Sequence, residues 1–228
     1  MSLSEPSFQA KLEELRAKLL LEEICLPLKG RTWHLTVAPD QDAMMELVEE
    51  LDKIPYGFLL WESAIGLAYY IEAHPEMVQG KRLLELGAGL GFAGLVARSV
   101  GAQVWQTDHL HGVLAIADYN AQKNGIQDIE RFVADWRTWE NKEQYDVLLG
   151  ADILYERQMQ PYLETIFCQA LAPDGVLILA DPQRAQAFHF ITQLENGGWQ
   201  FALETVKVPK EGVLGAEEMD IALYIGRR

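Results

Sequence analysis

The feature that most constrains this chain is a glycine-rich stretch at residues 81–94, with the sequence KRLLELGAGLGFAG. A short apolar run containing one acid precedes three alternate glycines, Gly87, Gly89 and Gly91, and an apolar segment, 92–100, follows them. This order predicts a buried strand, a tight turn and the start of a helix. Glycine suits such a turn because it adopts backbone angles that other residues resist and lets a ligand approach bare backbone. The stretch therefore predicts a loop that holds a nucleotide-type cofactor.

Length and composition indicate one sizeable α/β domain with room for an N-terminal addition, since the chain has 228 residues and is 49% apolar. No apolar run is long enough to span a membrane, and the apolar cluster at 12–28 is interrupted by Lys and Glu, unlike a signal peptide. We therefore expect no membrane partner. Cys25 and Cys168 lie far apart without a CxxC partner. We expect both to be buried free thiols in a reducing, cytoplasmic compartment.

The net charge of -15 is the unusual bulk property of the chain. It argues against tight binding to a phosphate backbone, which needs Lys and Arg to displace counterions, so we expect no nucleic-acid partner. It favours a basic partner such as a lysine-bearing protein surface. Solubility alone is a simpler explanation of the charge, and it stays open.

Beyond residue 54, apolar runs that predict strands alternate with runs that predict helices. The expected strands fall near residues 82–86, 103–107, 129–133, 147–150 and 176–180. The expected helices fall near residues 61–74, 92–100, 112–123, 160–170 and 184–195. This alternation predicts crossover connections, a mainly parallel sheet and helices on both of its faces. Two final apolar runs, 199–208 and 220–225, have no helix between them and predict an antiparallel hairpin. The expected fold is thus Rossmann-like, with a seven-stranded, mostly parallel sheet.

Residues 1–53 are expected to form an N-terminal extension packed on the core domain, residues 54–228. Apolar positions at helical spacing predict an amphipathic helix over 8–24. A strand is expected over 31–37 and a second helix over 41–51.

Two overlapping registers of the glycine loop predict different cofactors. Gly89, Gly91 and Gly94 match the dinucleotide fingerprint GxGxxG, with Asp108 about twenty residues further on for the ribose. The first glycine of that fingerprint should stand where the strand turns into the loop. Here the strand ends two residues earlier, at Gly87, which weakens the NAD interpretation.

The earlier register, Glu85-x-Gly87-x-Gly89-x-Gly91, suits S-adenosylmethionine. That cofactor has no pyrophosphate and therefore does not need the helix N-terminus as NAD does. It carries an ammonium and a sulfonium cation, which an acid such as Glu85 can accommodate. Asp108, at the end of the second core strand, can then accept hydrogen bonds from both ribose hydroxyls.

A third site, Ala134-Asp135-Trp136, follows the expected third core strand, where a loop would cover the adenine ring. Asp135 can accept a hydrogen bond from the adenine amine, and Trp136 can pack on the ring face. Each has a simpler alternative role, Asp135 as a helix N-cap or loop acid and Trp136 as a core residue. Together with the terminal hairpin, the set favours S-adenosylmethionine, while an NAD-dependent oxidoreductase stays open.

These residues resemble a known family. The segment LELGAGLG at 84–91 resembles the first motif of the seven-strand class I S-adenosylmethionine-dependent methyltransferases. The segments YGFLLWESA at 56–64 and GADILY at 150–155 resemble protein-lysine methyltransferases with a DxxY motif. The segment DPQR at 181–184 is similar to one in the branch that methylates the electron transfer flavoprotein β subunit. The resemblance covers about residues 54–228.

The resemblance implies in-line methyl transfer to a lysine side chain of a protein. Asp152 would bind the incoming amine and orient its lone pair, and Tyr155 would shape the channel. Their simpler alternatives are a helix N-cap for Asp152 and packing for Tyr155. The residues expected at the cofactor, with S-adenosylhomocysteine as its product form, are Trp61, Glu85, Gly87, Ala88, Gly89, Asp108, His109, Asp135, Trp136 and Ala151.

Other functions stay open at this point. A small-molecule N-methyltransferase or a non-catalytic cofactor-binding protein of the same fold would share the glycine loop. The chain lacks the Asn-Pro-Pro-Tyr type of sequence expected of base-amino methyltransferases, which disfavours a nucleic-acid substrate. His109 and His111 have no third ligand nearby in sequence, so we expect no metal. We expect Trp33, Trp105 and Trp139 to be packing residues.

Overall fold

The computed structural model describes residues 21–39, 56–210 and 217–228. The expected helix over 41–51 and most of the one over 8–24 lie outside these residues. The division into an extension and a core domain at residue 54 stays a prediction for the same reason.

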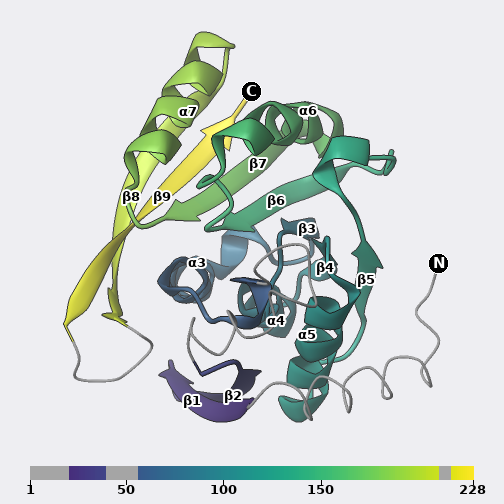
Figure 1. The fold of residues 1–228 in the computed structure, drawn as a ribbon, viewed down its shortest axis with the longest axis vertical. Helices are drawn as coiled ribbons and strands as arrows, with labels where there is room; N and C mark the ends of the chain where they lie inside the picture. Colours follow the sequence, from purple (N-terminus) through teal and green to yellow (C-terminus); the bar gives the residue numbers. More distant parts are fainter. Residues whose placement is uncertain (1–20, 40–55, 211–216) are drawn as a thin grey trace, which may run out of the picture.

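In the described part of the chain, one mixed sheet of seven strands carries the fold, in the order β5-β4-β3-β6-β7-β9-β8 (Figure 1). Its strands are β3 (Arg82–Leu86), β4 (Gln103–Asp108), β5 (Ile129–Val133), β6 (Tyr145–Ala151), β7 (Leu171–Asp181), β8 (Gln200–Pro209) and β9 (Glu218–Arg227). The neighbours from β5 to β7 pair in parallel, whereas β9 pairs antiparallel with both β7 and β8. The expected parallel sheet with an antiparallel terminal hairpin is confirmed.

Helices cover both faces of the sheet, also as expected. Figure 1 shows α3 (Glu62–Ala73), α4 (Phe92–Ser99) and α5 (His111–Lys123) on one face, and α6 (Gln160–Ala170) and α7 (Ala185–Asn196) on the other. Each face has its own buried apolar cluster, and β3 contributes to both because side chains alternate along a strand: Leu83 lies in one, Leu84 and Leu86 in the other. Among the described residues, no helix is long and apolar enough to cross a membrane.

A separate antiparallel hairpin, β1 (Glu22–Leu28) and β2 (Arg31–Val37), precedes the core. The expected strand over 31–37 is confirmed. The expected helix is wrong where it reached residues 22–24, because these residues belong to β1. The local pattern explains the error, since Leu26 and Leu28 are buried and their neighbours Cys25 and Pro27 are exposed. That is a period of two, which marks a strand.

The hairpin docks on α5 through two asparagines one helical turn apart. The backbone N–H of Thr36 donates to Asn120 Oδ1 at 2.8 Å, and that of His34 donates to Asn124 Oδ1 at 3.0 Å. Asn124 Nδ2 returns a bond to the His34 carbonyl at 2.7 Å. Asn120 Nδ2 also donates to the carbonyl of Leu90 at 3.3 Å. The two amides therefore satisfy part of the open edge of β2 and link the hairpin to the glycine-rich stretch.

The two cysteines differ from expectation. Both are free, but both are exposed rather than buried. Cys25 points outward from β1, and its sulfur lies 3.4 Å from His34 Nδ1. Cys168 lies on the outer face of α6, opposite the buried Leu163 and Phe167. The inference to a reducing cytoplasmic compartment stays a prediction.

Candidate active site

A cavity of about 480 Å³ lies at the carboxyl ends of β3, β4 and β6. Open α/β sheets bind ligands at such ends, where the strand order reverses, and here that point lies between β3 and β6. Predicted site residues that line it are Trp61, Gly87, Gly89, Asp108, His109, Asp135, Trp136, Ala151, Asp152 and Tyr155. The fold thus brings together residues spread over nearly a hundred positions of the sequence.

The glycine loop follows β3 directly, and its backbone requires glycine. Gly87, Gly89 and Gly91 have φ angles of 60°, 53° and 79°, in the left-handed region. A Cβ at Gly87 would lie 2.8 Å from the Ile153 side chain. Ala88, which was expected at the cofactor, is buried and donates its backbone N–H to Thr107 at 2.9 Å, so it fixes the loop rather than lining the cavity.

Asp108 ties the end of β4 to this loop. Its Oδ2 accepts from the backbone N–H of Gly89 at 3.1 Å, and its Oδ1 accepts from that of Leu110 at 3.2 Å. His109 Nδ1 lies 3.1 Å from Oδ1. Within the described residues, no group of three or more His, Cys, Asp or Glu side chains gathers as metal ligands would.

Glu85 lies beneath the loop, not in the cavity. Its Oε2 accepts from the backbone N–H of Gly94 at 3.1 Å and from Gln106 Nε2 at 2.7 Å. Arg131 in turn holds Gln106, donating from Nε to Oε1 at 2.9 Å. Burial raises the pKa of Glu85 to about 7, against the lowering effect of these two hydrogen bonds. This position does not fit a direct contact between Glu85 and the cations of a cofactor. The Glu85 carboxylate faces α4, where it accepts a hydrogen bond from Gly94 and stabilises the turn.

Gly94 is the residue that makes room for this carboxylate. It lies in α4, and a Cβ there would approach Glu85 Oε2 to 2.4 Å. Gly94 is therefore a packing glycine of the helix. The dinucleotide register, which required Gly94 as part of the fingerprint, is not supported.

Asp135 and Trp136 form one wall of the cavity, after β5. Asp135 caps a short 3-10 helix, Trp136–Thr138, by accepting from the backbone N–H of Arg137 at 2.9 Å. The Arg137 guanidinium, bound to the same carboxylate, lowers the pKa of Asp135 to about 2. Asp135 is thus a helix cap, as its simpler alternative predicted, and it also lines the cavity. A Cβ built on Gly87 would lie 3.3 Å from the Trp136 ring, so the ring adjoins the glycine loop.

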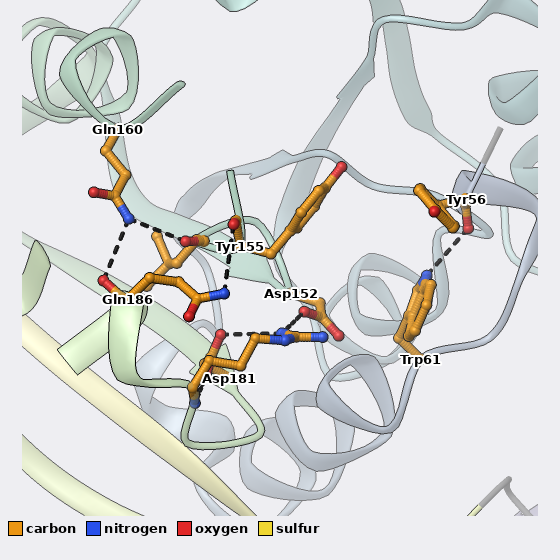
Figure 2. Close-up of polar contacts among 9 residues, drawn as sticks. Tyr56, Trp61, Asp152, Tyr155, Gln160, Asp181 and Gln186 are labelled. Atoms are coloured by element: carbon orange, nitrogen blue, oxygen red, sulfur yellow. Dashed lines mark hydrogen bonds and ion pairs between the residues drawn. The ribbon is translucent and has the colours of Figure 1, made fainter. Parts of the chain in front are cut away.

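Asp152 stands immediately after β6 and lines the cavity (Figure 2). It is buried and has a φ of 58°. It forms an ion pair with Arg184, whose backbone N–H donates to Asp181 Oδ1 at 2.6 Å. Burial raises the pKa of Asp152, and Arg184 acts in the opposite direction. The helix-cap alternative fails because Met159, not Asp152, caps α6.

Aromatic rings frame the same part of the cavity. The Tyr56 ring lies edge-on to Trp61 and Tyr155, with centroid distances of 6.0 and 6.5 Å. Trp61 Nε1 donates to the carbonyl of Tyr56 at 3.1 Å (Figure 2). Tyr155 is 46% exposed, too open for a core packing role. The Trp33, Trp105 and Trp139 rings, in contrast, contact Phe92, Tyr145 and Phe132 and are packing residues as expected.

Comparison with known proteins now identifies the family. A family model described as "Lysine methyltransferase" matches residues 40–197, more than half of the chain. The chain belongs to the lysine methyltransferase family. It is 32% identical over 176 residues to "Protein N-lysine methyltransferase METTL21A" of Mus musculus, covering 73% of this chain and 78% of the relative. It is 28% identical to "Histone-arginine methyltransferase METTL23" of Rattus norvegicus, covering 53% and 56%.

A solved structure supports the fold of this lysine methyltransferase family member. The ribosomal protein L11 methylase from Lactobacillus delbrueckii subsp. bulgaricus superposes with a TM-score of 0.58 at 21% identity, covering 75% of this chain and 81% of that one. The expected class I methyltransferase fold and methyltransferase activity are thus confirmed. Neither relative named above is an electron transfer flavoprotein methyltransferase, so that narrower branch stays a prediction.

Three residues that contact the predicted site residues Asp152 and Tyr155 directly or through a neighbour were given no role by the sequence. Arg184 and Asp181 lay in the DPQR segment, which was noticed only as a resemblance, and Tyr56 lay in the YGFLLWESA segment without a role. Asp181 and Arg184 do carry a signal, since DPQR begins at the last residue of β7 and the carboxyl ends of neighbouring parallel strands meet at one edge. Their contacts with Asp152 and Tyr155 join segments far apart in sequence, and no local pattern predicts such pairs.

Proposed function

We propose that this protein transfers a methyl group from S-adenosylmethionine to the side-chain amine of a lysine in another protein. The observation that carries the proposal is the position of Asp152, a buried carboxylate that shares one cavity with the glycine loop and with the rings of Tyr56, Trp61 and Tyr155. The family supports methyl transfer, and the relative METTL21A is named for lysine.

The cofactor half of the cavity fits S-adenosylmethionine better than a dinucleotide. Its lining combines bare glycine backbone, the acids Asp108 and Asp135, and the Trp136 ring. Arg137, the arginine in this lining, is paired with Asp135, so a pyrophosphate would have to compete for it. We assign the glycine loop to the methionine part, Asp108 to the ribose hydroxyls, and Asp135 with Trp136 to the adenine. When bound, this cofactor supplies a methyl group on a sulfonium sulfur, which keeps the bonding electrons when the acceptor nitrogen displaces it in line.

The acceptor half suits a lysine. A lysine ammonium has a reference pKa of about 10.4 and must release a proton to solvent before its nitrogen can attack. Asp152 would hold the ammonium by a charge-assisted contact and orient the lone pair of the free amine. The faces of Tyr56, Trp61 and Tyr155 would attract the cation and exclude water, which lowers the pKa of the lysine by desolvation. The Tyr155 hydroxyl would border the channel through which the side chain enters.

The partner would present that lysine on a basic surface. The net charge of -15 favours such a protein, because opposite charges speed encounter and disfavour acidic competitors. This part of the proposal predicts that methyl transfer to the partner slows as the salt concentration rises.

The test is methyl transfer from labelled S-adenosylmethionine into an extract of cells that lack this protein, followed by mass spectrometry of the labelled product. We expect label on lysine Nε of a protein, and none with Asp152→Asn. Label on arginine or on a small molecule would overturn the acceptor assignment. Thermal stabilisation by S-adenosylhomocysteine but not by NADH tests the cofactor separately.

A further inference from the structure

Arg184 joins two acids at the edge of the cavity. It caps the N-terminus of α7, three residues after Asp181 at the end of β7. Its Nη1 forms an ion pair with Asp152 Oδ1 and lies 3.2 Å from Asp181 Oδ2. The backbone N–H of the same residue donates to Asp181 Oδ1 at 2.6 Å. One arginine is thus fixed at both its main chain and its side chain by Asp181, and it presents its guanidinium to Asp152.

The backbone holds both acids firmly in place. β6 and β7 are neighbours, with Ala151 paired to Ala180, so Asp152 and Asp181 follow at adjacent strand ends. The backbone N–H of Asp152 donates to the carbonyl of Ala180 at 2.8 Å. Asp181 is fully buried, and the side chain of Asp152 is 6% exposed. Removal of the Arg184 side chain would therefore free the Asp152 carboxylate to rotate, while the backbone bonds of the sheet would stay intact.

Electrostatics explain why a cation is needed here. Burial raises the pKa of both Asp152 and Asp181, and the charge of Asp181 raises the pKa of Asp152 further. Arg184 opposes this for both acids. Burial also disfavours the charge on Arg184, but the two carboxylates raise its pKa overall. Among the described residues, the charge of Glu62 also acts on Asp152 and further disfavours its ionisation.

The ion pair also orients the carboxylate of Asp152. Oδ1 is the oxygen that meets Arg184. Asp152 also lines the cavity, together with Trp61, so the oxygen that does not meet Arg184 Nη1 is the one we assign to the cavity. A free carboxylate could rotate, whereas a guanidinium fixed by Asp181 selects one orientation.

Resting on the proposed function, we propose that Arg184 is a positioning residue: held by Asp181, it turns the second carboxylate oxygen of Asp152 toward the acceptor amine. Arg184 thereby acts through Asp152 and does not touch the acceptor. In this proposal Asp152 binds Arg184 through Oδ1 and the acceptor amine through its second oxygen.

The first test compares Arg184→Gln and Arg184→Lys with the wild type. We expect Arg184→Gln to lower kcat by about 100-fold, because a misplaced catalytic group costs about that much, while affinity for S-adenosylhomocysteine stays within about threefold. Arg184→Lys keeps the charge but loses the planar guanidinium that meets two carboxylates. Its kcat should therefore lie between those of the wild type and Arg184→Gln. The exposed Arg227, on β9, provides the control, and Arg227→Ala should leave kcat unchanged. Wild-type kcat in Arg184→Gln would overturn the proposal.

Chemical rescue separates positioning from a structural role. Millimolar guanidinium chloride should restore part of the activity of Arg184→Ala, because the free ion can occupy the vacated place between Asp152 and Asp181. It should not rescue Asp152→Asn, which lacks the carboxylate. Equal rescue of both variants, or of neither, would overturn the proposal.

A third measurement does not depend on methyl transfer, so failure of the proposed function would leave it standing. The side-chain carboxyl carbon of Asp152 can be titrated by nuclear magnetic resonance in the wild type and in Arg184→Gln. We expect the titration to move to higher pH in the variant, since burial and the neighbouring acids Asp181 and Glu62 are then unopposed. An unchanged titration would show that Arg184 does not control Asp152.

Discussion

Glu85 and Asp152 are two buried carboxylates on adjacent strands of one sheet, and they are held in opposite ways. Glu85 is bound by neutral donors, the Gly94 N–H and the Gln106 amide, and burial raises its pKa to about 7. Asp152 is bound by a guanidinium and opens on the cavity. Neutral donors hold Glu85 beneath the glycine loop, whereas a cation holds Asp152 at the wall of the cavity. Under the proposed function, the first contact shapes the loop and the second prepares a carboxylate for an amine.

The largest expected effects come from variants of Asp152 and Asp108, which test whether the two halves of the cavity serve the acceptor and the cofactor separately. Asp152→Asn should lower kcat about 1,000-fold, because it removes the carboxylate that orients the amine, with affinity for S-adenosylhomocysteine within about threefold. Asparagine is chosen because it tolerates the φ of 58° at this position. Asp108→Asn should have the reverse effect and lower the affinity for S-adenosylhomocysteine more than it lowers kcat. Steady-state kinetics and calorimetry measure both, and equal losses of kcat and affinity in Asp152→Asn would contradict the division.

A second prediction concerns the pH dependence of stability due to Glu85. Because its folded pKa is raised, its contribution to the free energy of unfolding is fully present at acid pH and is lost as the pH rises through about 7. Between pH 4.5 and pH 8, the wild type should lose about 3 kcal/mol more than Glu85→Gln, which keeps the shape but cannot titrate. Urea unfolding of both proteins measures this. Identical pH profiles would show that Glu85 is not buried as described.

A third, smaller effect tests the fit between Glu85 and α4. Alanine normally stabilises a helix interior relative to glycine by about 1 kcal/mol. Gly94→Ala should instead lower the free energy of unfolding by about 2 kcal/mol, because its Cβ would lie 2.4 Å from Glu85 Oε2 and 2.5 Å from Gln106 Nε2. Combining it with Glu85→Ala should remove part of this penalty and leave the part due to Gln106. A stabilised Gly94→Ala variant would be evidence against the close approach.

The smallest expected effect is on the exposed wall of the cofactor half. Arg137→Gln removes the ion pair with Asp135 but keeps the backbone hydrogen bond that caps the 3-10 helix. Exposed pairs contribute little, so affinity for S-adenosylhomocysteine should change by about threefold or less. Asp135→Asn serves as the comparison, since it alters the assigned adenine contact itself and should weaken binding more. Calorimetric titration compares the two variants.

The sheet was predictable because its signals are local. The expected bounds of β3, β5 and α6 match the structure, since alternating or helical apolar patterns set these elements. The sequence also held enough to place Glu85 correctly, because in β3 it shares a face with Leu83, toward α4, rather than pointing to the strand end. The charge of Glu85 predicts a contact with a cationic cofactor, whereas the period of two predicts a side chain buried against α4, and the structure follows the period.

The acceptor site was less predictable because its contacts are long-range. Asp152 was identified through a resemblance, but its bond to Arg184 spans 32 positions. The sequence predicted this strand only from Val176, whereas β7 begins at Leu171. Pro173 and Gly175 separate Leu171 from the apolar run that begins at Val176. The exposure of Cys25 and Cys168 shows that residue type alone does not decide burial.

The docking of the β1–β2 hairpin on α5 has a consequence for biosynthesis. Thr36 and His34 bind asparagines that lie 84 and 90 residues later in the chain. At ribosomal rates, roughly 5 to 20 s separate the synthesis of the hairpin from that of its docking site. During that interval the edge of β2 and the ring of Trp33, which later packs on Phe92, lack their partners. This early segment is therefore where we expect a chaperone to bind the nascent chain, until the last turns of α5 leave the ribosome.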